Sequence, residues 1–157
     1  SMKLRLLLIG AVLNLFAVDV MAQVPAHWLG SWKLNLAKSK YSPGPPPTSQ
    51  VDKNEVVEGA LKYTSDRVSA DGKAAHHEYT AKLDGKDYPY IGLPIADTIS
   101  ITRVDDNAME WTIKKGGKAL MSGQTVYSPD GKLRTWTWKG TNPKGQKFDV
   151  TSVFEKQ

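Results

Sequence analysis

The chain has 157 residues, of which 40% are hydrophobic and 24% charged, so its length allows one globular domain of ordinary size and is short for two. It contains no cysteine, which excludes disulfides, thiolate metal ligands and a cysteine nucleophile. The formal net charge is +5, but the lysines are scattered and form no run typical of a nucleic-acid-binding arm, so we expect no nucleic-acid partner.

The first residues of the chain follow the pattern of a secretory leader. Ser1 is interpreted as a residue added by cloning, and Lys3 and Arg5 then precede an apolar run. This run is short for a membrane-spanning helix, which needs about 20 apolar residues. We therefore expect the chain to contact a membrane only through this segment, and only if the segment is not cleaved. We therefore predict a signal peptide over residues 1–22, a mature domain over 23–157 and a secreted or periplasmic location.

Short β-branched and aromatic segments follow, separated by Gly, Pro, Asn and Asp, which is typical of a meander of antiparallel strands. A helical turn fits only residues 25–29, before the first strand, and the prolines within 42–48 predict a stiff extended crossing. Gly-containing pairs that allow the positive φ of tight hairpins predict turns, among others at 58–59, 71–72, 84–85, 116–117 and 130–131. Strands are predicted over 30–35, 50–57, 60–68, 74–82, 87–91, 98–104, 108–114, 118–127, 132–139 and 147–155.

About ten strands in so short a chain leave no room for a long helix, so the predicted fold class is all-β. An open sheet of this size would leave two long unpaired edges, and closure into a barrel removes them. We predict a single antiparallel meander closed into an eight- to ten-stranded barrel. A β-sandwich stays open as the alternative.

Alternation of apolar and polar residues predicts which side chains point into the barrel, because neighbours on a strand face opposite sides. Arg103, last in its strand, would either point inward or reach solvent at the barrel mouth. Residues 132–139 would face inward through Arg134, Trp136 and Trp138 or through the residues between them, and the tryptophans favour the first. The mixed polar and aromatic interior is typical of a ligand cavity. The residues expected to bind a ligand are Tyr63, His77, Tyr79, Arg103, Trp111, Arg134 and Trp136.

Few residues suggest catalysis. The sequence has no nucleophile elbow, phosphate loop, dinucleotide fingerprint or zinc-binding His-Glu-x-x-His motif, so we expect no cofactor. His76 and His77 are neighbours on one strand and point to opposite faces, so they cannot hold one ion together, and no metal site is predicted. His77, on the inward face with Tyr79, is the candidate for acid–base catalysis, and a buried histidine with only a structural role is the alternative.

Gly30-Ser31-Trp32 opens the first strand just after the helical turn and resembles the Gly-x-Trp start of the lipocalin and calycin barrels. The resemblance implies a calycin-like barrel in which the tryptophan closes one end and an arginine from a late strand packs across it. Arg134 is the matching candidate, with Arg103 second. The lack of cysteine and the Pro-rich crossing depart from true lipocalins.

A longer likeness extends over nearly the whole mature chain. It resembles a family of small secreted bacterial proteins of unestablished function, which implies an exported lipocalin-like domain and supplies no catalytic residues. The segments that carry this resemblance are 30–45, 77–82, 84–89 and 140–142.

Three hypotheses of function follow. The first is a secreted or periplasmic barrel that binds a small hydrophobic or amphipathic ligand in its interior, with an arginine holding any acidic end. The second is a small cofactor-independent barrel enzyme of lyase, isomerase or cyclase type that uses His77 with Tyr79 and Arg103. The third is an envelope interaction module without a ligand, which would need a filled core and an exposed apolar patch or unpaired strand.

Overall fold

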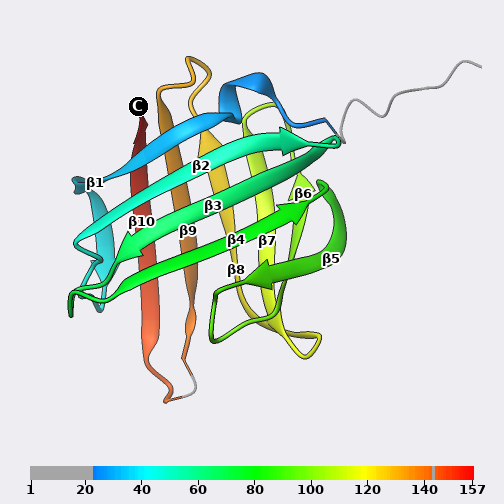
Figure 1. Cartoon of the computed structure of the whole chain (residues 1–157). Helices are drawn as coiled ribbons and strands as arrows, with labels where there is room; N and C mark the ends of the chain where they lie inside the picture. Colours follow the sequence, from blue (N-terminus) through cyan, green and yellow to red (C-terminus); the bar gives the residue numbers. More distant parts are fainter. Residues whose placement is uncertain (1–22, 143) are drawn as a thin grey trace, which may run out of the picture.

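The computed structural model describes residues 23–142 and 144–157, and the predicted signal peptide lies outside this part of the chain. The described residues form a closed antiparallel barrel (Figure 1) in which each strand pairs with its neighbours in the chain and the first strand pairs with the last. A 3₁₀ turn, η2 (Ala26–Trp28), precedes the barrel. The strands are β1 (Gly30–Ser42), β2 (Ser49–Val57), β3 (Ala60–Val68), β4 (Ala74–Ala81), β5 (Asp84–Ile91), β6 (Thr98–Arg103), β7 (Ala108–Lys115), β8 (Lys118–Tyr127), β9 (Leu133–Thr141) and β10 (Lys147–Lys156).

The predicted all-β barrel is therefore confirmed, with ten strands and a short helical turn before the first, and the sandwich is excluded because β1 and β10 close the sheet. Two boundaries were wrong. β1 continues to Ser42 through a register shift between Asn35 and Lys40, so it is longer than predicted. The predicted turn at 84–85 lies inside β5, where Gly85, at φ 77°, is part of an irregularity in the pairing with β6. The chain reverses one step earlier, at Leu83, whose side chain is buried in the core.

One end of the barrel is sealed by aromatic side chains. The Trp28 ring from η2 stacks on Tyr127 with centroids 4.7 Å apart, and the Trp32 indole donates a hydrogen bond of 3.0 Å to the carbonyl oxygen of Trp28. Both tryptophans are completely buried. Asn54 donates to the Trp28 carbonyl oxygen and to the Tyr127 hydroxyl, so η2 is fixed to β2 and β8. Helical turn and barrel strands thus form one continuous core at this sealed end.

A buried ion pair lies directly above this aromatic plug. Arg134 of β9 and Asp52 of β2 are 1% and 0% exposed, and the guanidinium Nη2 donates to Asp52 Oδ2. The guanidinium carbon lies 4.1 Å from the Phe154 ring centroid and 5.6 Å from that of Trp32. Cation and carboxylate are both removed from water here, so each depends on the other for compensation of its charge.

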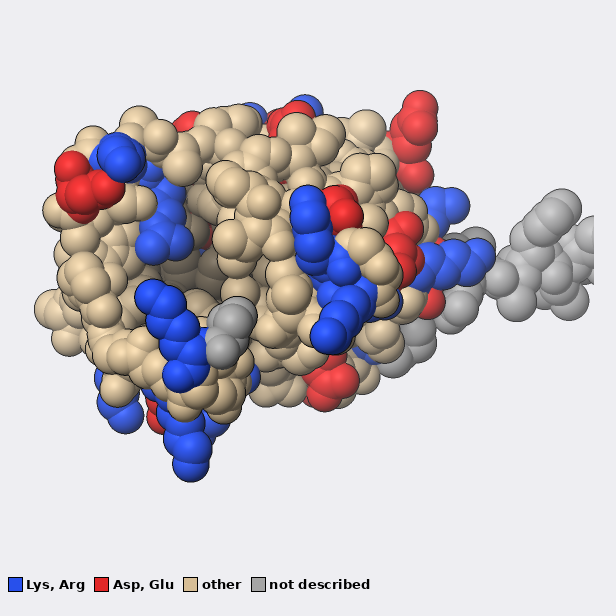
Figure 2. Space-filling model, turned by 90° about the horizontal axis from the view of Figure 1, so that it is seen from below, with Lys and Arg blue, Asp and Glu red and all other residues tan. Residues whose placement is uncertain are grey.

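The opposite end is open. The connections 43–48, 69–73, 92–97 and 116–117 lie there, together with the β9–β10 hairpin. Figure 2 views the molecule from this side and shows a hollow between these connections. No helix among the described residues is long and apolar enough to span a membrane.

Removing the carboxylate of the buried pair tests its role in the fold. We expect Asp52→Ala to lower the free energy of unfolding by about 3–5 kcal/mol, because Arg134 would stay buried with its charge uncompensated. Chemical denaturation measures this loss. Glu55→Ala, which breaks the exposed pair between Lys53 and Glu55 on the same strand, is the matched control and should change stability far less. Equal losses in the two variants would contradict a special role for Asp52.

Candidate functional site

The open end leads into a cavity of about 340 Å³ inside the barrel. This volume lies near the lower limit of the range of small-molecule sites, about 300–1,000 Å³. Its walls are mainly apolar, with Ile99, Met109, Ile113 and Met121 on one side. The crossing from β1 to β2 contributes Pro43-Gly44-Pro45 to the lining, so the Pro-rich segment borders the entrance instead of sealing it.

Two tryptophans from strands distant in the sequence form the aromatic wall of the cavity. Trp111 of β7 donates from Nε1 to Thr125 Oγ1 at 3.1 Å, and its ring centroid lies 6.3 Å from that of Trp136 on β9. Gly123 of β8 makes this placement sterically possible, since a Cβ there would lie 2.4 Å from the Trp111 ring. The indole Nε1 of Trp136 is buried and has no hydrogen-bond partner among the described residues. The wall is therefore fixed at Trp111 and keeps an unused donor at Trp136.

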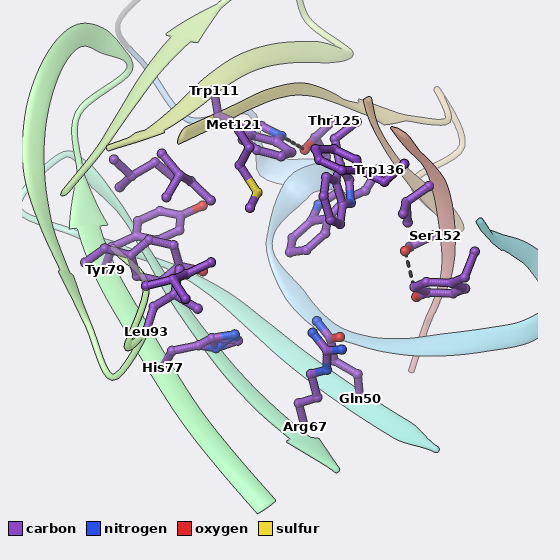
Figure 3. Close-up of a pocket in the computed structure, with 18 of the residues that line it drawn as sticks. Gln50, Arg67, His77, Tyr79, Leu93, Trp111, Met121, Thr125, Trp136 and Ser152 are labelled. Atoms are coloured by element: carbon purple, nitrogen blue, oxygen red, sulfur yellow. Dashed lines mark hydrogen bonds between the residues drawn. The ribbon is translucent and has the colours of Figure 1, made fainter. Parts of the chain in front are cut away.

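The polar side chains of the cavity come from β2, β3 and β4. Figure 3 shows Gln50 and Arg67 side by side, with His77 projecting toward the same space. Gln50 donates to Asp52 Oδ1 at 3.0 Å and thereby connects the cavity to the buried ion pair. Arg67 Nε and His77 Nδ1 are both buried, and neither has a hydrogen-bond partner in the described part of the chain.

Burial sets the protonation states of the cavity's titratable groups. It lowers the pKa of His77, which stacks on Tyr90 with centroids 5.7 Å apart, so the imidazole is neutral at neutral pH. It raises the pKa values of Tyr79 and Tyr90, so both phenols keep their protons. Arg67, whose side chain is a guanidinium, is then the one cation among the residues that line the cavity.

Four of the predicted ligand-binding residues line this cavity: His77, Tyr79, Trp111 and Trp136. Tyr63 does not line it, because its ring lies behind Tyr79 and stacks on it with centroids 4.8 Å apart. The sequence left open which face of residues 132–139 points inward. In the structure, the inward face is that of Arg134, Trp136 and Trp138: Arg134 is buried, and both tryptophans line the cavity.

The two predicted arginines, Arg103 and Arg134, lie at the sealed end and do not line the cavity. Arg134 is held by Asp52 beside Trp32, the position that the calycin resemblance implies. Arg103 neither enters the cavity nor reaches solvent at the mouth. Its guanidinium is buried, donates to the carbonyl oxygens of Gln23 and Asp105, and pairs with Asp106. Each of the two guanidinium groups is thus paired with a carboxylate of the chain itself.

Arg67 and Gln50 are polar cavity residues that are not among the expected ligand-binding residues. On the predicted strand 60–68 the expected ligand-binding residues include only Tyr63. Continuing the same alternation by two further steps reaches Ser65 and Arg67, so the signal was present in the sequence.

The structure also bears on the catalytic and metal hypotheses. No group of three or more metal-ligating side chains is found among residues 23–142 and 144–157. His76 points outward, where its Nδ1 lies 2.7 Å from Asp66 Oδ1, while His77 faces the cavity. The acid–base hypothesis requires a hydrogen bond from His77 to a carboxylate or tyrosine, and the described residues contain none. Comparison with protein-family models and with curated proteins finds no match for the chain.

The lowered pKa of His77 predicts a pH dependence of stability. In the unfolded chain the imidazole regains a pKa near 6.5 and takes up a proton more readily than in the folded protein. Stability should therefore fall as the pH decreases below about 6.5, and level off once the folded state is also protonated. Chemical denaturation at several pH values, with His77→Gln as the non-titrating reference, measures this. An equal slope in the two proteins would show that His77 does not contribute.

Proposed function

We propose that this protein binds a small hydrophobic or amphipathic molecule inside the barrel. The observation that carries the proposal is a cavity of about 340 Å³ that opens at one end of the barrel and is walled by aromatic and aliphatic side chains. Such a cavity, with a few polar groups that fix orientation, is the usual form of a small-molecule site. The leader-like residues 1–22 support a secreted or periplasmic setting for this binding.

The aromatic wall favours a flat or ring-containing ligand. Trp111 and Trp136 lie at a tilt of 55° and offer two faces at which a planar body can pack or contact a ring edge. Binding inside the barrel would also cover apolar side chains that now line an open space.

The alternative hypotheses have less support. The interaction module requires a filled core together with an exposed apolar patch or an unpaired strand, whereas the described strands enclose a cavity and close into a ring. The enzyme hypothesis requires a partner for His77, and its other suggested residue, Arg103, is bonded at the sealed end. Ligand binding is the proposed function that accounts for both the open cavity and its aromatic and aliphatic walls.

Two fluorescent probes with almost the same aromatic body, anilinonaphthalene sulfonate and N-phenylnaphthylamine, test the proposal. We expect at least one of them to bind with enhanced, blue-shifted emission and energy transfer from the cavity tryptophans. Met121→Trp, which places an indole in the cavity, should weaken that binding by about tenfold or more, a loss of about 1.4 kcal/mol.

The matched control is Leu120→Trp on the same strand. Leu120 points outward and is 44% exposed, so an indole there adds the same surface without entering the cavity. Circular dichroism establishes that both variants keep the fold. Equal affinities for the two variants, or failure of the unaltered protein to bind either probe, would contradict interior binding.

A further inference from the structure

The three inward-facing arginines of the barrel differ in how their charges are neutralised. At the sealed end, Arg134 pairs with Asp52 and Arg103 with Asp106. Arg67, in the cavity, forms no ion pair with any described residue, and its buried Nε has no hydrogen-bond partner there. A half-buried guanidinium without a counterion is costly in a largely apolar space. The fold therefore leaves one cation at the ligand site uncompensated.

The nearby carboxylates are not available to Arg67. Asp66, its neighbour on β3, faces outward and lies 2.7 Å from His76. Asp52 accepts hydrogen bonds from Arg134 and from Gln50, so both of its oxygens are in use. Gln50, paired with Arg67 across β2 and β3, contributes a neutral amide and no charge. The described residues therefore supply no carboxylate to Arg67, and an anion from outside the barrel could take that place.

Charge differs between the two barrel ends, although the open-end connections also contain Asp71 and Asp97 and the sealed-end connections also contain Lys82 and Lys132. We call the exposed residues Lys115, Lys118, Lys144 and Lys147 the mouth lysines: they lie at the open-end hairpins, and none forms an ion pair with a described residue. Figure 2 shows Lys and Arg side chains on both sides of the hollow. The connections at the sealed end instead carry several carboxylates. These include Glu58, Asp105, Asp106 and Asp130.

From these observations we propose that the ligand is an amphipathic anion: a planar, ring-containing or otherwise apolar body that carries one oxyanion, a carboxylate or a sulfonate. This inference rests on the proposed function and deepens it. The oxyanion lies at Arg67, because the guanidinium fork matches two oxygens of such a group. The apolar body lies against Trp111 and Trp136 across the cavity (Figure 3).

The orientation follows from the order of residues along the barrel. Arg67 stands one residue before the end of β3 at the open end, whereas Trp111 lies in the middle of β7. The charged group therefore stays near the mouth and the apolar body enters first. The mouth lysines attract the anion and raise its rate of approach, an effect that salt screens.

The same pair of probes tests the charge assignment, because anilinonaphthalene sulfonate carries an oxyanion that N-phenylnaphthylamine lacks. We expect the anionic probe to bind the unaltered protein more tightly. Arg67→Met, which keeps a long apolar side chain and removes the charge, should weaken the anion roughly tenfold to a hundredfold and leave the neutral probe within about twofold. Unchanged binding of the neutral probe also shows that the variant is folded.

Two further variants sharpen the test. Arg67→Lys restores the charge and should recover part of the preference for the anion. Lys33→Met, which removes an exposed lysine on β1 near the sealed end and away from the cavity, is the charge control and should change anion affinity by less than about twofold. Equal weakening of both probes in Arg67→Met, no weakening, or tighter binding of the neutral probe by the unaltered protein would overturn the anion assignment alone. Binding of neither probe would overturn interior binding itself, and this inference with it.

Discussion

The buried pair of Arg134 and Asp52 is the interaction on which the arrangement of the barrel depends. It joins β9 to β2, strands far apart in the sequence, at the level where the sealed end begins. Below it Trp28, Trp32 and Tyr127 pack as a plug, and above it Gln50 takes the second oxygen of Asp52 and faces the cavity. A buried charge pair whose carboxylate also accepts a hydrogen bond from Gln50 resists sliding of one strand past another, because any shift would leave a buried charge uncompensated.

This constraint gives the barrel two different ends. At the sealed end the first turn of the chain is held by hydrogen bonds from Trp32 and Asn54 to one carbonyl oxygen, so the space is filled by the chain itself. At the other end the strands continue outward without a plug, and the crossing at 43–48 passes along the border of the opening. The packing of Trp28, Trp32 and Tyr127 thus both closes the sealed end and sets how deep the cavity can extend from the open end.

Much of the fold could be predicted from the sequence, because glycine-containing turn pairs separate segments in which apolar and polar residues alternate regularly. Prediction failed where local signals compete with tertiary contacts: Gly85 allows positive φ inside an irregular strand, and burial of Leu83 turns the chain earlier. The site was recovered only in part. Alternation states which face a side chain occupies but not its height along the barrel axis, so Arg103 and Arg134 looked equivalent to cavity residues although both lie at the sealed end. The same rule places Arg67 on the inward face, because it lies two alternation steps beyond Tyr63 on the predicted strand 60–68.

The position of an arginine along the barrel axis also decides whether its charge is paired with a carboxylate of the chain. An arginine placed low, as at position 134, meets a carboxylate supplied by the chain and stabilises the closure. An arginine placed near the mouth, as at position 67, meets no such partner and keeps its capacity to bind an anion. A barrel selected for stability alone would gain by replacing that guanidinium with an apolar side chain, since the cavity around it is largely apolar. Its presence beside an aromatic wall, at the open end of the cavity, is therefore the feature that the proposed anion binding accounts for.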